Sequence, residues 1–243
     1  MPVRAKTTDA PVRVSVSCLA ELMNSPNRSV ESVLRPHKFN KRGEGFARSG
    51  YYQYALAAIR NHHSSGNDPN VFNAALLELR SKAATADEKW RRVKRAKNAD
   101  AIEAYRAIYG KRHFRVLTNH RIGYPIAQVI FTAQPDLWVF DEDEEVQVLL
   151  KIGIAKKRSS YVDVLLTVMR KAAVSSGYLK VRARNVVYLN VTTGKEMICE
   201  SNLTRFNRTF AFIARTIALT WPNVTPPDTG RTGRKAHAAS ASG

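Results

Sequence analysis

Residues 134–151 decide the fold, and they read Gln-Pro-Asp-Leu-Trp-Val-Phe, then the acidic turn Asp141–Glu145, then Val-Gln-Val-Leu-Leu-Lys. Two runs rich in β-branched and aromatic residues flank a short polar connection, and this pattern predicts a β-hairpin. A turn centred near Asp143 puts Asp136 across from about Leu150, beside Lys151. The sequence therefore predicts a carboxylate and a lysine side by side on adjacent strands.

Such a pair has two interpretations, and the residues alone leave both open. In a metal-dependent nuclease site, Asp136 would hold a divalent cation and Lys151 would position or activate the attacking water. In the alternative, the pair is a structural salt bridge. A lysine in an otherwise apolar strand needs solvent or a carboxylate partner, and Asp136 is the natural partner.

Outward from the hairpin, periodicity and breaker residues predict helices first, then strands with a crossover helix between two of them. The expected helices are 18–23, 51–63, 71–84, 87–109, 160–176 and 202–220. The expected strands are 12–16, 114–118, 127–132, 136–140, 146–154 and 186–191, with a loop over 35–45 and a turn around 123–125. This order predicts an α/β protein with a mixed central sheet flanked by helices.

The same patterns divide the chain into four segments. Residues 1–11 and 222–243 are expected to be disordered termini, because they are polar or rich in Pro, Gly, Ala and Ser. Residues 12–110 are expected to form a helical N-terminal part, and residues 111–221 the α/β core.

Composition points to a polyanionic partner. The 243 residues carry a net charge of +19, which favours nucleic acid over an acidic protein or a membrane surface. No apolar run approaches the roughly 18 residues of a membrane span. Two cysteines are too few for a disulfide framework, and the N-terminus lacks an apolar signal core, so a cytoplasmic location is expected.

The order of several motifs resembles the PD-(D/E)XK nuclease superfamily, in particular its RecB-like exonuclease branch. The core hairpin of that family reads Pro-Asp, then Asp/Glu-x-Lys; here Pro135-Asp136 and Lys151 match it. Ser15-Val-Ser-Cys-Leu19 resembles an upstream Ser-x-Ser-x-Leu element, and residues 50–54 resemble a Gly-x-x-x-His element. The resemblance covers roughly residues 12–220. It implies a restriction-endonuclease-like core and, in an active member, Mg²⁺-dependent cleavage of DNA.

This chain departs from the family pattern at the acidic positions. Leu149 stands where the family has Asp or Glu, Tyr54 stands where it has His, and no clear Gln-x-x-x-Tyr follows. Asp163, twelve residues past the lysine, is the candidate substitute acid, because some members carry their second metal-binding acid on the next helix. Glu103 is a candidate upstream metal ligand. Asp163 could equally be a first-turn aspartate, and Glu103 a solvated ion-pair partner.

Two basic segments are the candidate nucleic-acid contacts. The first is a run within the long helix that includes Arg91, Arg92, Lys94 and Arg95, interleaved with Trp90 and Tyr105, and it could grip phosphates and stack on bases. The second segment follows the hairpin and consists of Lys156, Lys157 and Arg158. The solvated face of a helix is the alternative for the first. No His/Cys spacing indicates zinc, and the acidic turn reads as solvated.

These observations lead to an ordered set of hypotheses. The first is a nucleic-acid-binding protein, with DNA favoured over RNA, built on a degenerate and inactive PD-(D/E)XK-like core. The second is an active Mg²⁺-dependent nuclease that uses Asp136, Lys151 and the relocated acid Asp163. The third is a structural or assembly protein whose basic surface binds an acidic partner.

Overall fold

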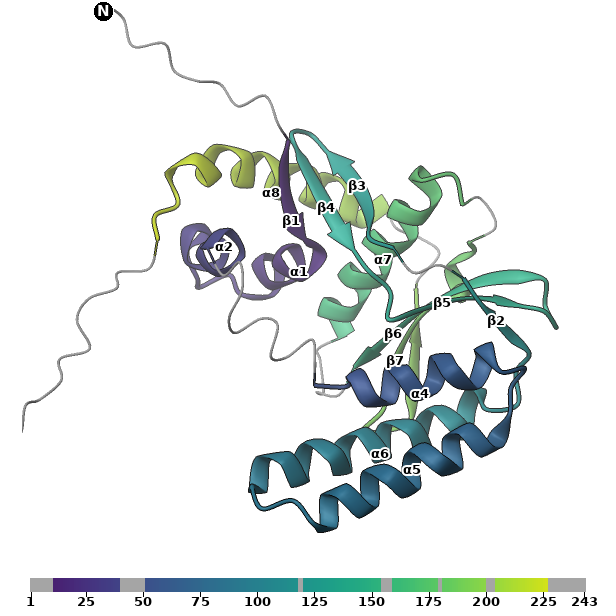
Figure 1. Cartoon of the computed structure of the whole chain (residues 1–243). Coiled ribbons are helices and arrows are strands. Elements are labelled where there is room, and N and C mark those ends of the chain that lie inside the picture. The colour runs from purple at the N-terminus through teal and green to yellow at the C-terminus, as the bar shows by residue number, and fades with distance from the viewer. Residues whose placement is uncertain are drawn as a thin grey trace, which may run out of the picture.

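The computed structural model describes residues 11–39, 51–117, 120–153, 159–178, 181–199 and 204–226, without the side chains of 204 and 205. Over these residues the chain is a mixed α/β protein, and Figure 1 shows helices on both sides of its sheets. The helices are α1 (Val16–Asn24), α2 (Val30–Phe39), α4 (Gln53–Ser64), α5 (Pro69–Ala84), α6 (Lys89–Tyr109), α7 (Ser159–Ser175) and α8 (Thr204–Thr220). The strands are β1 (Val12–Ser15), β2 (Phe114–Val116), β3 (Ile122–Ile126), β4 (Val129–Ala133), β5 (Leu137–Asp141), β6 (Val146–Gly153), β7 (Val186–Asn190) and β8 (Lys195–Ile198).

The described strands form two mixed sheets. The larger sheet has the order β2-β5-β6-β7-β8, with β5 antiparallel to β6 and β6 parallel to β7. The smaller sheet has the order β1-β4-β3, with β1 parallel to β4. The α/β class and the hairpin are confirmed, and α7 is the helix between the parallel strands β6 and β7, as the sequence predicts.

Strand β6 lies between β5 and β7 in the larger sheet, and this central position explains why residues 148–150 are all apolar. Leu149 and Leu150 are both fully buried, although adjacent side chains of a strand point to opposite faces. Leu149 packs in a cluster with residues of α7, and Leu150 packs in a second cluster with residues of α6. A central strand covered by helices on both faces has no polar side, so its sequence does not alternate.

The described residues of the segment 12–110 lie on both sides of the larger sheet. β1, α1 and α2 belong to the cluster that includes α7, α8 and the smaller sheet. Helices α4, α5 and α6 belong to the cluster on the other face of the larger sheet. Figure 1 shows the two groups on opposite sides of β5, β6 and β7.

Helix α2 occupies the beginning of the segment expected to be a loop, so that prediction is wrong up to Phe39; residues 40–45 lie outside the described part. Pro36 sits inside the helix and has no N–H to donate to the carbonyl four residues earlier. That carbonyl belongs to Ser32, and it accepts a hydrogen bond from the Arg28 guanidinium at 3.3 Å. The arginine thus replaces the donor that the proline removes.

The turn expected around residues 123–125 is part of strand β3, and the true turn follows it. Gly123 pairs with Thr132 and Pro125 with Ile130. β3 is at the edge of its sheet, where a proline removes no hydrogen bond that the sheet needs. Ala127, with φ of 51°, lies in the connection between β3 and β4.

Residues 222–226, at the predicted start of the tail, belong to the described part of the chain, and most of them are exposed. Val224 is buried, and the Lys38 ammonium donates to the carbonyls of Trp221 at 2.6 Å, Pro222 at 3.3 Å and Val224 at 3.0 Å. This lysine provides donors just after the end of α8, where a positive charge is favourable. Among the residues that the structure describes, no helix is long and apolar enough to cross a membrane.

Candidate functional site

The β5–β6 hairpin brings Asp136 and Lys151 into direct contact, as the sequence predicts. Leu137 pairs with Leu150, so Asp136, one residue earlier, lies opposite Lys151. The Asp136 N–H donates to the Leu150 carbonyl at 2.9 Å and continues the ladder past the formal end of the strand. Lys151 Nζ donates to Asp136 Oδ1 at 2.8 Å.

The remaining polar atoms of Asp136 are also engaged. Its Oδ2 accepts the backbone N–H of Ile152 at 2.7 Å, and its carbonyl accepts the Arg60 guanidinium at 2.8 Å. Lys151 makes a second hydrogen bond, to the Gln134 carbonyl at 3.3 Å. Both side chains are partly buried, with 19% of Asp136 and 30% of Lys151 exposed. The pair therefore has the geometry of a structural ion pair that fastens the open end of the hairpin.

Leu149 lies on the same face of β6 as Lys151 but inside the core. Its cross-strand neighbours are Trp138 on β5 and Val186 on β7, and both are buried with it. An acid at this position would have no path to solvent along the strand. The position at which the resemblance would place a second acid is therefore a packing position in this chain.

Tyr188 faces Lys151 from the next strand and closes the site on that side. Burial, together with the neighbouring Tyr161 phenol and the Asp136 carboxylate, raises the pKa of Tyr188 to about 12. The ring needs the space beside Gly153, because a Cβ there would lie 1.7 Å from the tyrosine hydroxyl. Tyr188 remains a neutral phenol at physiological pH.

Asp163, the candidate substitute acid, and Glu103, the candidate upstream metal ligand, belong to helices on opposite sides of the larger sheet. Asp163 is half-buried on α7, the helix that covers the Leu149 face. Glu103 forms an ion pair with Arg80 on the solvent side of α6, in the layer that covers the opposite face of the sheet. Within the described ranges, no three His, Cys, Asp or Glu side chains are grouped to hold a metal. Each carboxylate oxygen of Asp136 already accepts one hydrogen bond, and Leu149 offers no oxygen ligand.

The basic run on α6 is a surface feature. Arg91 and Arg92 are exposed, whereas Lys94 and Arg95 are half-buried. Arg91 pairs with Glu88 at 2.9 Å, and Arg95 donates to the Lys82 carbonyl. The second predicted basic segment, Lys156, Lys157 and Arg158, lies outside the described residues.

Two aromatic residues of the sequence analysis have different positions from those expected. Tyr54, where the resemblance would place a histidine, lies beside Lys94, whose Nζ is 5.5 Å from the ring centre. Tyr105 is fully buried and cannot stack on a base. Arg60, whose guanidinium binds the Asp136 carbonyl, was not predicted to be part of the site. The signal in the sequence was that it is the one lysine or arginine within α4.

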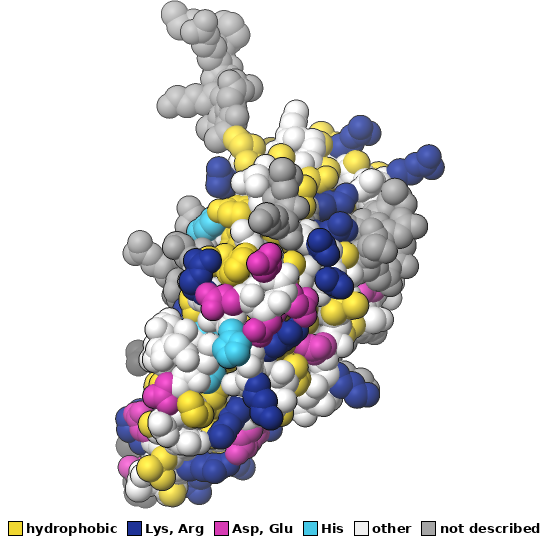
Figure 2. Space-filling view, turned by 90° about the vertical axis from the view of Figure 1, so that its right-hand side faces the viewer, with side chains coloured by type: hydrophobic (Ala, Val, Ile, Leu, Met, Phe, Trp, Pro, Cys, Tyr) yellow, Lys and Arg dark blue, Asp and Glu magenta, His cyan; other side chains and the backbone are white. Residues whose placement is uncertain are grey.

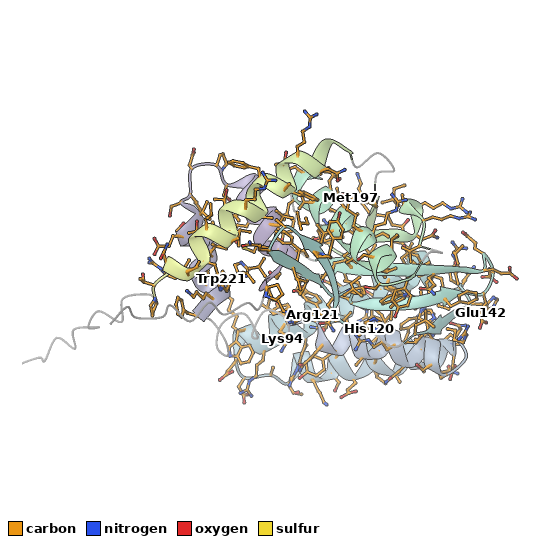
Figure 3. All side chains as sticks on the ribbon, turned by 90° about the horizontal axis from the view of Figure 1, so that it is seen from above. Lys94, His120, Arg121, Glu142, Met197 and Trp221 are labelled. Atoms are coloured by element: carbon orange, nitrogen blue, oxygen red, sulfur yellow. The ribbon has the colours of Figure 1, made fainter. Side chains whose placement is uncertain are left out.

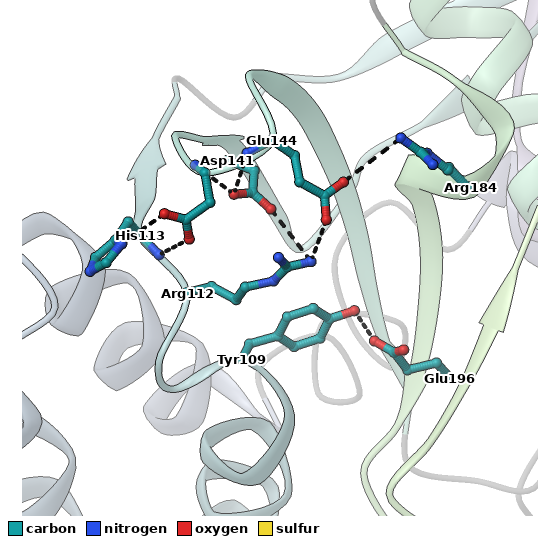
Figure 4. A network of polar contacts seen from close by, with 8 residues as sticks. Tyr109, Arg112, His113, Asp141, Glu144, Arg184 and Glu196 are labelled. Carbon is teal, nitrogen blue, oxygen red and sulfur yellow. Dashed lines mark hydrogen bonds and ion pairs between the residues drawn. The ribbon is translucent and has the colours of Figure 1, made fainter.

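The acidic turn is a network of ion pairs at the far end of the hairpin, where Figure 3 labels Glu142. Buried Asp141 accepts the N–H of Asp143 at 3.1 Å, and Glu144 pairs with Arg112 at 2.9 Å (Figure 4). His113 contacts Asp143 at 2.9 Å; this contact lowers the pKa of the aspartate and raises that of the histidine. Figure 2 shows Asp and Glu side chains interspersed with Lys and Arg on this side of the molecule. The turn is thus paired with cations rather than simply solvated.

The chain matches no protein-family model and no curated protein. Its function therefore has to be inferred from the residues and contacts described above.

Proposed function

We propose that this chain is a nucleic-acid-binding protein whose core resembles that of PD-(D/E)XK nucleases but does not hydrolyse its ligand. The observation that carries the proposal is the surplus of cations at the start of α6. Between residues 87 and 97 there are six Lys and Arg residues and two carboxylates, within a chain of net charge +19. DNA is the preferred partner, because the family that the chain resembles acts on DNA.

The expected affinity comes mainly from release of counterions. Of the six cations, Arg91 and Lys97 are in ion pairs with Glu88 and Asp100. We assume that each of the other four cations neutralises one phosphate. A plot of the logarithm of the association constant against the logarithm of the salt concentration should then have a slope of about −3.6 on duplex DNA. Affinity should then drop about a hundredfold between about 50 and 200 mM salt.

The proposed lack of hydrolysis rests on Asp136 and Leu149. Magnesium dehydrates reluctantly and is usually held by one or two carboxylates together with substrate oxygens. Asp136 is bonded to Lys151 and to the Ile152 N–H, and Leu149 is inside the core. Opening this arrangement for a metal would leave a partly buried lysine without its carboxylate, which is unfavourable.

Binding is tested by fluorescence anisotropy of labelled DNA over a salt series. The test variant is Lys89→Glu combined with Arg92→Glu, both at exposed positions of α6. The control is Arg208→Glu combined with Arg215→Glu, exposed on α8, which Figure 1 places at the opposite end of the molecule from α6. Both variants change the net charge equally. We expect at least a tenfold loss of affinity and a salt slope smaller by about two for the α6 variant alone. An equal loss in the control would refute α6 as the surface.

Hydrolysis is tested with linear duplex, single-stranded and structured DNA in Mg²⁺ or Mn²⁺. We expect the substrates to stay at full length. Cleavage that Asp136→Ala and Lys151→Ala both abolish would instead establish the active nuclease, with Asp163 as the next acid to replace. Tight binding of acidic proteins combined with no binding of nucleic acid would favour an assembly role.

A further inference from the structure

Trp90 is a large aromatic side chain that the fold leaves 60% exposed, in the first turn of α6. Trp138, by contrast, is 1% exposed in the core. The Arg91 guanidinium lies 5.4 Å from the Trp90 ring centre, so an exposed ring and a cation stand together at the start of the basic run. An exposed ring beside a cation can stack on an unpaired base while the cation meets the adjacent phosphate.

Lys94 and Tyr54 extend this arrangement along the helix. Lys94 is four residues after Trp90, so it lies on the same face of α6, about 6 Å further along the axis. Its Nζ is 5.5 Å from the ring centre of Tyr54, which is 45% exposed. The order along the surface is therefore aromatic ring, cation, aromatic ring.

Asn98 holds the two helices that carry these rings in a fixed relation. It is fully buried; its Oδ1 accepts the Ala55 N–H at 3.0 Å, and its Nδ2 donates to the carbonyls of Tyr51 at 2.7 Å and Lys94 at 2.8 Å. The amide thus joins the start of α4 to α6 one turn after Lys94. Tyr54 and Lys94 are positioned by a buried polar link rather than by a surface contact alone.

Beyond Tyr54 the surface opens into a groove of about 730 Å³ between α4 and α5. Small and aliphatic side chains, such as Ala57, Ala74 and Val71, line the groove, and Tyr54 and Arg95 also contribute to its wall. Arg95 is held there by its hydrogen bond to the Lys82 carbonyl. The groove offers an apolar floor for a flat ring, and its wall also carries the Glu78–Lys82 ion pair beside Arg95.

We propose that Trp90, Lys94, Tyr54 and this groove form a binding track for single-stranded nucleic acid. Bases stack on Trp90 and Tyr54, and phosphates contact Lys94 and Arg95. In a duplex the base faces are already stacked inside the helix, so the two rings add little there. Because the track belongs to the surface of the proposed function, it specifies which form of nucleic acid that surface prefers.

The test compares a labelled 20-nucleotide single strand with the duplex of the same sequence, by anisotropy at fixed salt. The variants are Trp90→Leu and Tyr54→Leu, which remove an exposed ring without changing charge. The matched control is Phe212→Leu, which removes a 70% exposed ring on α8. We expect each track variant to bind the single strand about tenfold more weakly, or worse, and to bind the duplex as the unmodified chain does. The control should match the unmodified chain on both ligands.

A second readout follows the tryptophan emission directly. Stacking should quench the emission of the unmodified chain on addition of single strand, and Trp90→Leu should lose most of this quenching. If the track variants bind both ligands normally while the α6 charge reversal weakens binding, the track is refuted and the proposed function survives. If the unmodified chain binds neither ligand, both are refuted.

Discussion

Replacing Leu149 by aspartate restores the acid of the family pattern, and we expect this change to unfold the protein rather than to create a nuclease. Leu149 has no exposed surface and lies between Trp138 and Val186. Loss of a buried leucine side chain costs about 2–5 kcal/mol. Burying an ionised carboxylate without a dedicated partner adds several kcal/mol. The sum is comparable to the whole stability of a domain, about 5–15 kcal/mol.

Urea unfolding, followed by tryptophan emission, measures this effect; buried Trp138, the direct cross-strand neighbour of Leu149, contributes to that emission. The unmodified chain should unfold cooperatively. Leu149→Asp should show either no cooperative transition or a much lower urea concentration at the midpoint of unfolding. Leu149→Met, which nearly conserves volume, should stay within about 1.5 kcal/mol of the unmodified chain. The reasoning is refuted if Leu149→Asp folds with near-normal stability and gains Mg²⁺-dependent stability or cleavage. In that case the position would be open to a metal site.

Three further predictions concern stability. Burial lowers the pKa of His63, which contacts the Tyr105 hydroxyl at 2.8 Å, from 6.5 to about 4. The unfolded chain therefore binds the proton first, and stability should fall by up to about 3 kcal/mol as pH drops from about 6.5 to 4. His63→Gln should flatten the pH dependence of urea unfolding, and an unchanged slope would contradict the assignment. Lys38→Met should lower the unfolding free energy by about 2 kcal/mol, because it removes a charged donor from three carbonyls after α8; a thermal shift within error of zero would argue against that role. Gly153→Ala should cost about 1–3 kcal/mol through its clash with Tyr188, and a neutral effect in the same assay would show that the ring can move aside.

The sequence was most informative where local patterns set the structure. The hairpin and the contact between Asp136 and Lys151 were predictable, because alternating strand geometry and a short turn fix the register within about one residue. The βαβ step through α7 was predictable for a similar reason, since a helical pattern lies between two strand patterns. The smaller sheet was not, because β1 and β4 are about 115 residues apart and nothing in their periodicity indicates that they pair.

Helix α2 and strand β3 were not predicted correctly, because each contains a proline, a residue that usually ends a helix or a strand. Pro36 argues against a helix unless a side chain from elsewhere satisfies the freed carbonyl, as Arg28 does. Pro125 argues against a strand unless the strand is at an edge. For the site, sequence identified the basic run, but it could not separate exposed Trp90 from buried Tyr105. That difference depends on where α4 packs against α6.

The most direct test of the central claim mixes a labelled DNA duplex with this protein in the presence of Mg²⁺, and records the affinity at about 50 and 200 mM salt and the length of the labelled strand afterwards. We predict binding that weakens about a hundredfold over this range and a strand that remains at full length. Binding that is indifferent to salt, or shortening of the strand that Asp136→Ala abolishes, would contradict a binding protein with a structural Asp136–Lys151 pair.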